Sequence, residues 1–139
     1  MAAEPVVALM SIRPRFAQAI LEGKKTVELR RVPLKRPVTH VVIYETGITG
    51  AIVGLFEVRR IVEQSPRQTW RTYNGTSGLT KKEFDAYFIG KQCAVAIEVG
   101  HTCRFPEPVP LAEIAVTRPP QSFMYLSSSH VGRFIQNPS

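Results

Sequence analysis

The chain has 139 residues, 44% of them hydrophobic and 21% charged, a composition that favours one globular domain. No apolar run approaches the roughly 18 residues of a membrane span, and no basic region precedes an apolar core at the N-terminus, so we expect a cytoplasmic protein without membrane contact. Its 18 Lys and Arg residues against 11 Asp and Glu residues give a formal net charge of +7. This excess favours a polyanionic partner, because Lys and Arg neutralise phosphates.

The N-terminal half is predicted to contain four strands and one helix. Pro14 is typical of a helix start, because N–H groups in the first turn have no partner within the helix and proline therefore loses no hydrogen bond there. Gly23 is typical of a helix end. Apolar, β-branched runs between Gly and Pro residues predict the strands. They lie at residues 6–10, 25–31, 38–44 and 51–62, and Gly47 and Gly50 mark the turn between the last two.

The C-terminal half mixes helices, strands and prolines. Ser65 and Pro66 open a helical turn that extends to Trp70, and Thr80 with Glu83 forms a capping-box pattern before a helix at residues 81–89. A further strand is predicted at residues 93–99. Prolines at positions 106, 108, 110, 119 and 120 should prevent long regular structure, which indicates edge strands and turns before a short helix after residues 127–129.

These elements predict the fold class. Five to six strands with two to three short helices favour an α+β fold built on a small, partly closed β-barrel over a βαβ sheet. Residues 1–139 contain no repeat or low-complexity tract, so we expect one domain with a core at about 6–126 and a tail at 127–139. The oligomeric state does not follow from the sequence.

Cysteine and histidine spacing argues against a metal centre. Cys93 and Cys103 lack a CxxC pair or a neighbouring histidine cluster, so we predict two free thiols, buried or half-buried. His40 and His101 have no partners at ligand spacing and are interpreted as structural residues. We therefore expect no metal site and no cofactor.

The strand at residues 25–31 carries the main candidate site. Its alternation places Thr26, Glu28 and Arg30 on one face, with Lys25 at the strand entrance. A cation there can neutralise phosphate, and a carboxylate can accept from an exocyclic amine or a ring N–H of a base. The alternative is a salt bridge between Glu28 and Arg30 or Arg31 on a solvated face.

Aromatic and polar side chains elsewhere are further candidates for base binding. Tyr44 can stack on a base, or it is a half-buried barrel residue. Gln121, Ser122 and Phe123 follow two prolines and suit a base-binding wall, or they pack the C-terminal strand. Trp70, beside Arg67 and Arg71, can likewise stack on RNA, although core anchoring is the simpler interpretation. The barrel is expected to gather a basic rim from Lys24, Lys25, Arg30, Arg31, Lys35 and Arg36.

The segment SIRPRFAQAILEGKKTVELRR at residues 11–31 resembles the signature of the ASCH domain family, in which GxKxxExR follows a helix. Here those positions are Gly23, Lys25, Glu28 and Arg30. KRPVTHVVIYET, GLFEV, SGLTKKEFDAYF and RPPQSFMYL are similar to segments of stand-alone or helix-turn-helix-linked members described as predicted regulators, so the resemblance covers about residues 7–126. It implies a PUA-like β-barrel whose motif lines a cleft between the barrel and the helices. No helix-turn-helix segment is present in this sequence.

The resemblance leaves three functional hypotheses. The first is a module that binds RNA, single-stranded nucleic acid, or a modified nucleobase or nucleotide in the cleft. The second is a metal-independent ribonuclease or nucleoside amidohydrolase with Lys25, Glu28 and Tyr44 as catalytic residues. Relative to the family's amidohydrolase, Glu28 replaces the threonine nucleophile, and residues 74–77 (NGTS) lack its expected carboxylate. The third is an interaction domain for an acidic protein partner.

Overall fold

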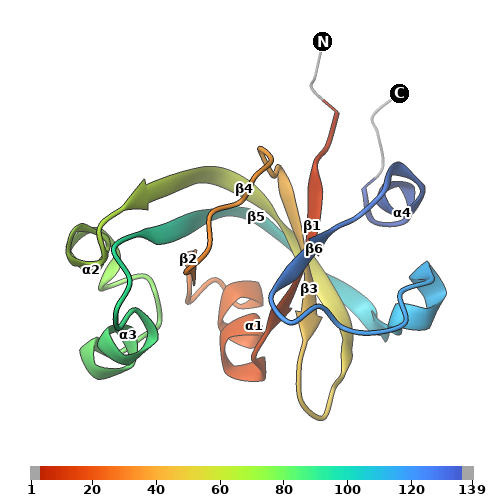
Figure 1. Cartoon of the computed structure of the whole chain (residues 1–139). Helices are drawn as coiled ribbons and strands as arrows, with labels where there is room; N and C mark the ends of the chain where they lie inside the picture. Colours follow the sequence, from red (N-terminus) through yellow and green to blue (C-terminus); the bar gives the residue numbers. More distant parts are fainter. Residues whose placement is uncertain (1–3, 136–139) are drawn as a thin grey trace.

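The computed structural model describes residues 4–135 and contains one curled six-stranded sheet with short helices around it (Figure 1). The α+β class and the barrel-like sheet predicted from the sequence are confirmed. Its elements are β1 (Val7–Ile12), α1 (Pro14–Leu21), β2 (Val27–Arg30), β3 (His40–Glu45), β4 (Ala51–Gln64), α2 (Pro66–Tyr73), α3 (Lys81–Tyr87), β5 (Ala94–Val109), the 3₁₀ helix η1 (Leu111–Ile114), β6 (Phe123–Tyr125) and α4 (Ser128–Phe134).

The sheet has the strand order β2-β5-β4-β3-β1-β6, in which β1 and β3 are parallel and all other neighbours antiparallel. The first half of β4 pairs with β3, and its second half pairs only with the start of β5. Three register shifts interrupt the pairing of these two long strands. Because a β-bulge increases local twist and bends a strand, these shifts account for the curl of the sheet.

Three apolar clusters stabilise the fold. The first lies between α1 and the curled sheet and includes Ala17, Ile20 and Phe56. The second lies on the other face of β1 and β3, where it includes Leu9 and Val42 and meets η1. The third fixes α2 and α3 against β2 and β5. Alternation along β2 produces this last contact, because Val27 and Leu29 face the helices while Glu28 and Arg30 line the cleft described below.

The local signals for helix ends are confirmed. α1 has Pro14 in its first turn, and Gly23 follows its end with a φ of +78°, in the left-handed region that glycine adopts without strain. α3 shows both halves of the capping box, with Thr80 accepting from the Glu83 N–H and the Glu83 carboxylate accepting from the Thr80 N–H. α2 begins after the N-cap Ser65 and continues to Tyr73, beyond the predicted turn.

The region after residue 99 differs from the prediction in three respects. β5 runs through Pro106 and Pro108 to Val109 as one long strand, whereas the prolines were expected to prevent long regular structure and to leave edge strands and turns. β2 pairs only with residues 95–98 of β5, so the proline-containing half has an unpaired edge where a missing N–H is tolerated. Both thiols are free, but Cys103 lies exposed on this half instead of half-buried. Residues 4–135 also form four α-helices instead of two or three, because the segments after Ser65 and Ser127 both form complete helices.

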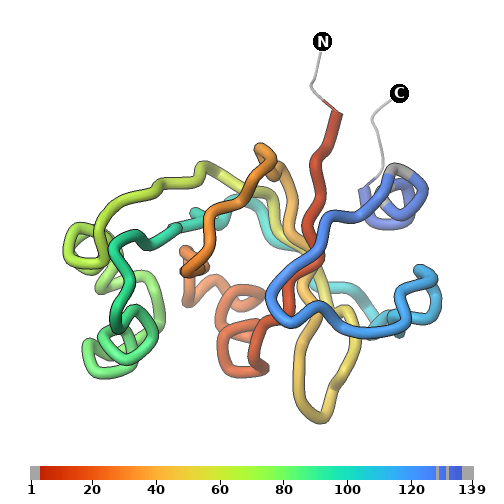
Figure 2. The backbone as a smooth tube through the Cα atoms, in the orientation of Figure 1, coloured from red at the N-terminus to blue at the C-terminus, as the bar shows by residue number. Residues whose placement is uncertain are grey.

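Figure 2 shows that a segment near the C-terminus lies beside the first strand of the chain. β6, in blue, lies against β1, in red, and pairs with it antiparallel from Ala8 to Met10. The Ser11 N–H donates to the Ser122 carbonyl just beyond this ladder. The segment before β6 is therefore fixed beside the end of β1, close to the start of α1.

Candidate functional site

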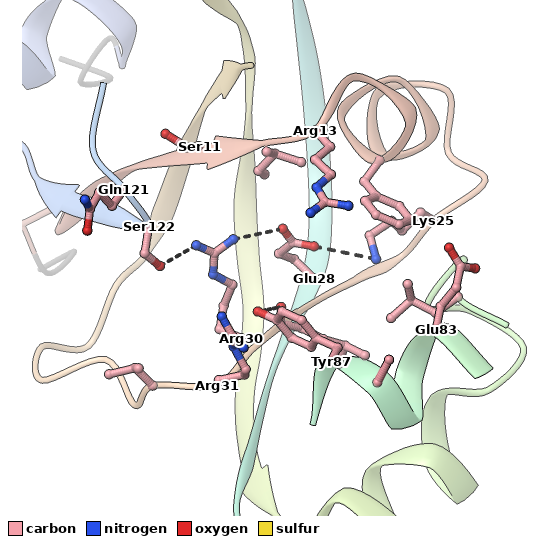
Figure 3. A pocket seen from close by; sticks show the side chains of 16 residues that line it. Ser11, Arg13, Lys25, Glu28, Arg30, Arg31, Glu83, Tyr87, Gln121 and Ser122 are labelled. Carbon is pink, nitrogen blue, oxygen red and sulfur yellow. Dashed lines mark hydrogen bonds and ion pairs between the residues drawn. The ribbon is translucent and has the colours of Figure 1, made fainter. Parts of the chain in front are cut away.

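A cleft of about 670 Å³ opens between the sheet and α3. Its lining comes from β2, from the junction of β1 and α1, from α3 and from the segment before β6 (Figure 3). Four cationic and two carboxylate side chains line it: Arg13, Lys25, Arg30 and Arg31, with Glu28 and Glu83. The cleft is therefore polar and carries a positive balance of charge.

Lys25 is the most deeply buried charged residue of the cleft, with a relative exposure of 2%. Its Nζ donates to the carbonyl of Ser77 and lies 4.9 Å from the centre of the Phe16 ring. Burial lowers the pKa of Lys25 below its ordinary value, because desolvation penalises the ammonium, while the Glu28 carboxylate opposes this shift. The site thus combines a desolvated cation with a nearby carboxylate.

Glu28 lies at the centre of the constellation, with a relative exposure of 6%. Its Oε1 is 3.5 Å from Lys25 Nζ, and its Oε2 is 3.4 Å from the nearer guanidinium nitrogen of Arg30. The salt bridge considered from the sequence therefore exists, but in a buried setting and not on a solvated face. Two cations share one carboxylate, so the group as a whole keeps a positive charge.

Arg30 connects this group to the C-terminal segment. Its other terminal nitrogen donates to Ser122 Oγ, so the chain of contacts runs from Lys25 through Glu28 and Arg30 to Ser122 (Figure 3). Ser11 Oγ donates to the carbonyl of Pro120, which holds the same segment against β1. Gln121 and Ser122 are exposed at the cleft and offer an amide and a hydroxyl to a ligand.

The walls of the cleft contain residues that the sequence argument did not assign. Arg13 precedes α1 and is exposed, whereas Tyr87 is half-buried on α3. Arg31, a predicted site residue, lies with its guanidinium carbon 4.6 Å above the Tyr87 ring. Arg13 lies within the quoted SIRPR segment and Tyr87 within FDAYF, but only the tertiary fold brings them beside β2.

Glu83 on α3 is engaged by Arg15 of α1. The two Arg15–Glu83 hydrogen bonds measure 2.6 and 3.1 Å, and Arg15 also donates to the carbonyl of Gly78. Hydrogen bonds from Arg15 and from the Thr80 N–H lower the pKa of Glu83 to about 2. This ion pair joins α1 to α3.

Four other predicted site residues lie outside the lining. Lys24 is exposed and pairs with Glu22 at 3.0 Å, and Thr26 is exposed before β2. Tyr44 is buried in the second apolar cluster, and Phe123 packs against the first cluster with its ring centre 5.6 Å from that of Tyr125. The predicted rim residues Lys35 and Arg36 are exposed near Tyr125 and do not line the cleft either.

In residues 4–135, no helix is long and apolar enough to cross a membrane. No group of three or more His, Cys, Asp and Glu side chains in this part of the chain is placed to hold a metal ion.

The curled six-stranded sheet, with the GxKxxExR segment at a polar cleft, defines the architectural class of ASCH domains. The family model of the ASCH domain matches residues 10–102. An ASCH domain-containing ribonuclease of Zymomonas mobilis is 30% identical over 136 residues, covering 92% of this chain and 89% of the relative. The crystal structure of ASCH from Zymomonas mobilis has a TM-score of 0.84 at 30% identity and covers 91% of this chain and 92% of that one.

The chain therefore belongs to the ASCH domain family. A second relative is the large ribosomal subunit protein uL22 of Ureaplasma parvum, which is 30% identical over 120 residues. This match covers 85% of the chain but only 38% of the length of that relative. The family and fold expected from the sequence resemblance are confirmed by these matches.

Proposed function

We propose that the protein binds single-stranded RNA in the cleft, with one base directed at Glu28 and neighbouring phosphates at the arginines of the walls. The observation that carries this proposal is the shared carboxylate of Glu28 at 3.5 and 3.4 Å from two cations on the floor of a polar cleft. Both distances exceed those of short charge-assisted hydrogen bonds, so the carboxylate keeps acceptor capacity for a ligand.

The floor offers complementary groups to a base edge. Glu28 accepts from an exocyclic amine or a ring N–H, whereas Arg30 donates to a ring nitrogen or a carbonyl. Lys25 is buried and already donates to Ser77, so its role here is to hold the Glu28 carboxylate in place. Recognition by such edges suits an unpaired base, because a base within a duplex does not expose them.

The walls of the cleft offer groups that can contact the phosphate backbone and the face of a base in the RNA. Arg13 and Arg31 are exposed, and neither guanidinium forms an ion pair with any residue from 4 to 135. They are thus free to contact phosphates, which supply most sequence-independent affinity. The Arg31 guanidinium, whose carbon lies 4.6 Å from the centre of the Tyr87 ring, also offers a flat face on which a base can stack.

Fluorescence anisotropy with labelled single-stranded oligonucleotides tests the proposal. We expect Arg13→Gln and Arg31→Gln each to weaken binding about tenfold, and to reduce the slope of log affinity against log salt by about 0.7 per lost phosphate contact. Lys91→Gln and Arg118→Gln remove exposed cations outside the cleft and serve as matched controls. Equal affinities for all four variants would contradict the proposal.

Ribonuclease activity is the second candidate. It is supported by the 30% identity, over nearly the full length of both chains, to a relative named as a ribonuclease. In this version Glu28 accepts the proton of a ribose 2′-hydroxyl, the 2′-oxygen attacks the adjacent phosphorus, and the 5′-oxygen leaves with a proton from Lys25. Arg30 stabilises the charge that develops on the phosphorus oxygens.

Product analysis distinguishes binding from cleavage. Incubation with RNA should yield fragments ending in 2′,3′-cyclic phosphate, detected by mass spectrometry, and Glu28→Gln should abolish them while the variant remains folded by circular dichroism. Cleavage that persists in Glu28→Gln, or intact RNA recovered from the wild-type protein, would refute this second candidate and leave the binding proposal to the anisotropy experiment.

A further inference from the structure

A second concavity, which we call the α2–α3 groove, lies on the side of α3 away from the cleft. It has a volume of about 440 Å³ and is formed by Arg67, Trp70 and Arg71 of α2 with Lys81, Phe84 and Asp85 of α3. α3 thus serves both concavities, because Glu83 and Tyr87 on the same helix line the cleft. Figure 1 shows α2 and α3 together at one end of the molecule, beside β2.

The groove is cationic. Lys81 is paired with Asp85 at 2.6 Å, which neutralises one charge of each sign. Arg67 and Arg71 are exposed one helical turn apart, and neither forms an ion pair with residues 4–135. Two unneutralised guanidinium groups on one face therefore favour an anion with charges repeated along its length, as in a phosphate backbone.

Trp70 supplies an aromatic surface between these cations. One part of the ring packs against Phe84, with ring centres 5.1 Å apart, while the residue remains half-buried and lines the groove. The Nζ of Lys81 lies 5.7 Å from the centre of the Trp70 ring. Aromatic rings that are at least partly exposed beside unpaired cations are the arrangement that holds bases and phosphates of single-stranded nucleic acid.

We infer that the α2–α3 groove is a second contact site for single-stranded RNA, occupied when a strand bound in the cleft crosses α3. Arg67 and Arg71 contact phosphates there, and one base stacks on Trp70. This inference rests on the RNA binding proposed for the cleft. It predicts a minimum length for the RNA that occupies both sites, since an oligonucleotide confined to the cleft does not reach the far side of α3.

Trp70 is the only tryptophan of the chain, so its emission reports directly on the groove. The full chain is titrated with oligouridylates of about four and about twelve nucleotides, a range that matches known single-strand sites. We expect the longer oligomer to quench Trp70 emission and to bind at least tenfold more tightly than the shorter one. The shorter oligomer should bind in the cleft without quenching.

Charge variants test the same point independently. Arg67→Gln combined with Arg71→Gln should abolish the quenching and the length preference while leaving affinity for the short oligomer unchanged. Lys91→Gln combined with Arg118→Gln removes the same charge elsewhere and should leave both effects intact. Trp70→Phe, which keeps a ring against Phe84, should retain the length preference measured by anisotropy.

Each remaining outcome has a defined meaning. Equal affinity for both oligomers, with Trp70 emission unchanged, overturns the groove and leaves cleft binding standing. Quenching that survives the loss of Arg13 and Arg31, with unchanged affinity, supports the groove and overturns the cleft. Quenching by oligoglutamate but not by oligouridylate shows that the groove takes an acidic protein segment, and so overturns the inference. Absence of binding to either oligouridylate overturns both proposals.

Discussion

Glu28→Gln removes the carboxylate that two buried cations share, and its cost can be worked from the structure. The side chain lies 3.5 Å from Lys25 Nζ and 3.4 Å from Arg30, with Lys25 only 2% exposed. Removing one partner of a buried ion pair costs about 3–5 kcal/mol, because the remaining charge stays desolvated. Since Arg30 retains its bond to Ser122, we expect a loss near the lower limit, about 3 kcal/mol of unfolding free energy and roughly 10 °C in Tm.

Lys25→Met is the matched comparison. Met fills the space of the buried aliphatic stem, and Glu28 keeps its contact with Arg30. The loss then reduces mainly to the hydrogen bond with the Ser77 carbonyl, which costs about 1–2 kcal/mol. Because the two residues are in contact, the double variant should lose at least about 1 kcal/mol less than the sum of the single variants.

The pH dependence follows from Lys25. Burial lowers the pKa of folded Lys25 below its ordinary value of 10.5, so the unfolded chain binds more protons between those two pKa values. This residue's contribution to stability therefore increases as pH rises through that window. Loss of Glu28 lowers the pKa of Lys25 further, so the stability deficit of Glu28→Gln should shrink as the pH is raised from neutral towards 10.5.

Urea unfolding followed by circular dichroism over this pH range measures these effects. A deficit for Glu28→Gln below about 1 kcal/mol, or a larger deficit for Lys25→Met than for Glu28→Gln, would refute the buried-charge argument. A deficit that stays constant with pH would refute the assignment of the titrating group to Lys25.

Three further predictions concern the scaffold. Glu83, with a pKa of about 2, contributes stability that is complete above about 4.5 and lost as pH falls towards 2, so the Tm values of wild type and Glu83→Gln should converge over that range in thermal unfolding. Gly54→Ala places a Cβ 2.5 Å from the Cys103 carbonyl oxygen and should cost about 2–3 kcal/mol in urea unfolding, whereas Gly75→Ala meets nothing within 4 Å and should change stability by less than about 1 kcal/mol. Thr80→Ala removes the N-cap of α3 and should cost about 1 kcal/mol by the same assay, while Thr80→Ser should retain most of the stability.

Structural features that depend on residues close in the sequence were predicted best. The capping box of α3 and the glycine after α1 act within a few positions, so their patterns predicted both helix ends. The prolines of β5 misled because their effect depends on whether the N–H faces a neighbouring strand. β2 is too short to pair with that half of β5, and no local pattern encodes this.

The candidate site shows the same division. Alternation within β2 predicted that Glu28 and Arg30 share a face, and the structure agrees. Thr26 has the same parity but precedes the strand and lies exposed. The link from Arg30 to Ser122 spans 92 positions, and Tyr87 reaches the cleft from α3. Contacts between such distant segments result from the curl of the sheet, which the sequence predicts only as a fold class.

Stability of the fold does not by itself account for the buried charges of the cleft. A buried ion pair is often no more stable than apolar residues of similar volume, because desolvation offsets the attraction. Lys25 and Glu28 are nevertheless nearly as deeply buried as the neighbouring apolar residues Val27 and Leu29. If Lys25→Met with Glu28→Gln folds more stably than Glu28→Gln alone yet loses oligonucleotide binding, the charges act on a ligand and not on the fold.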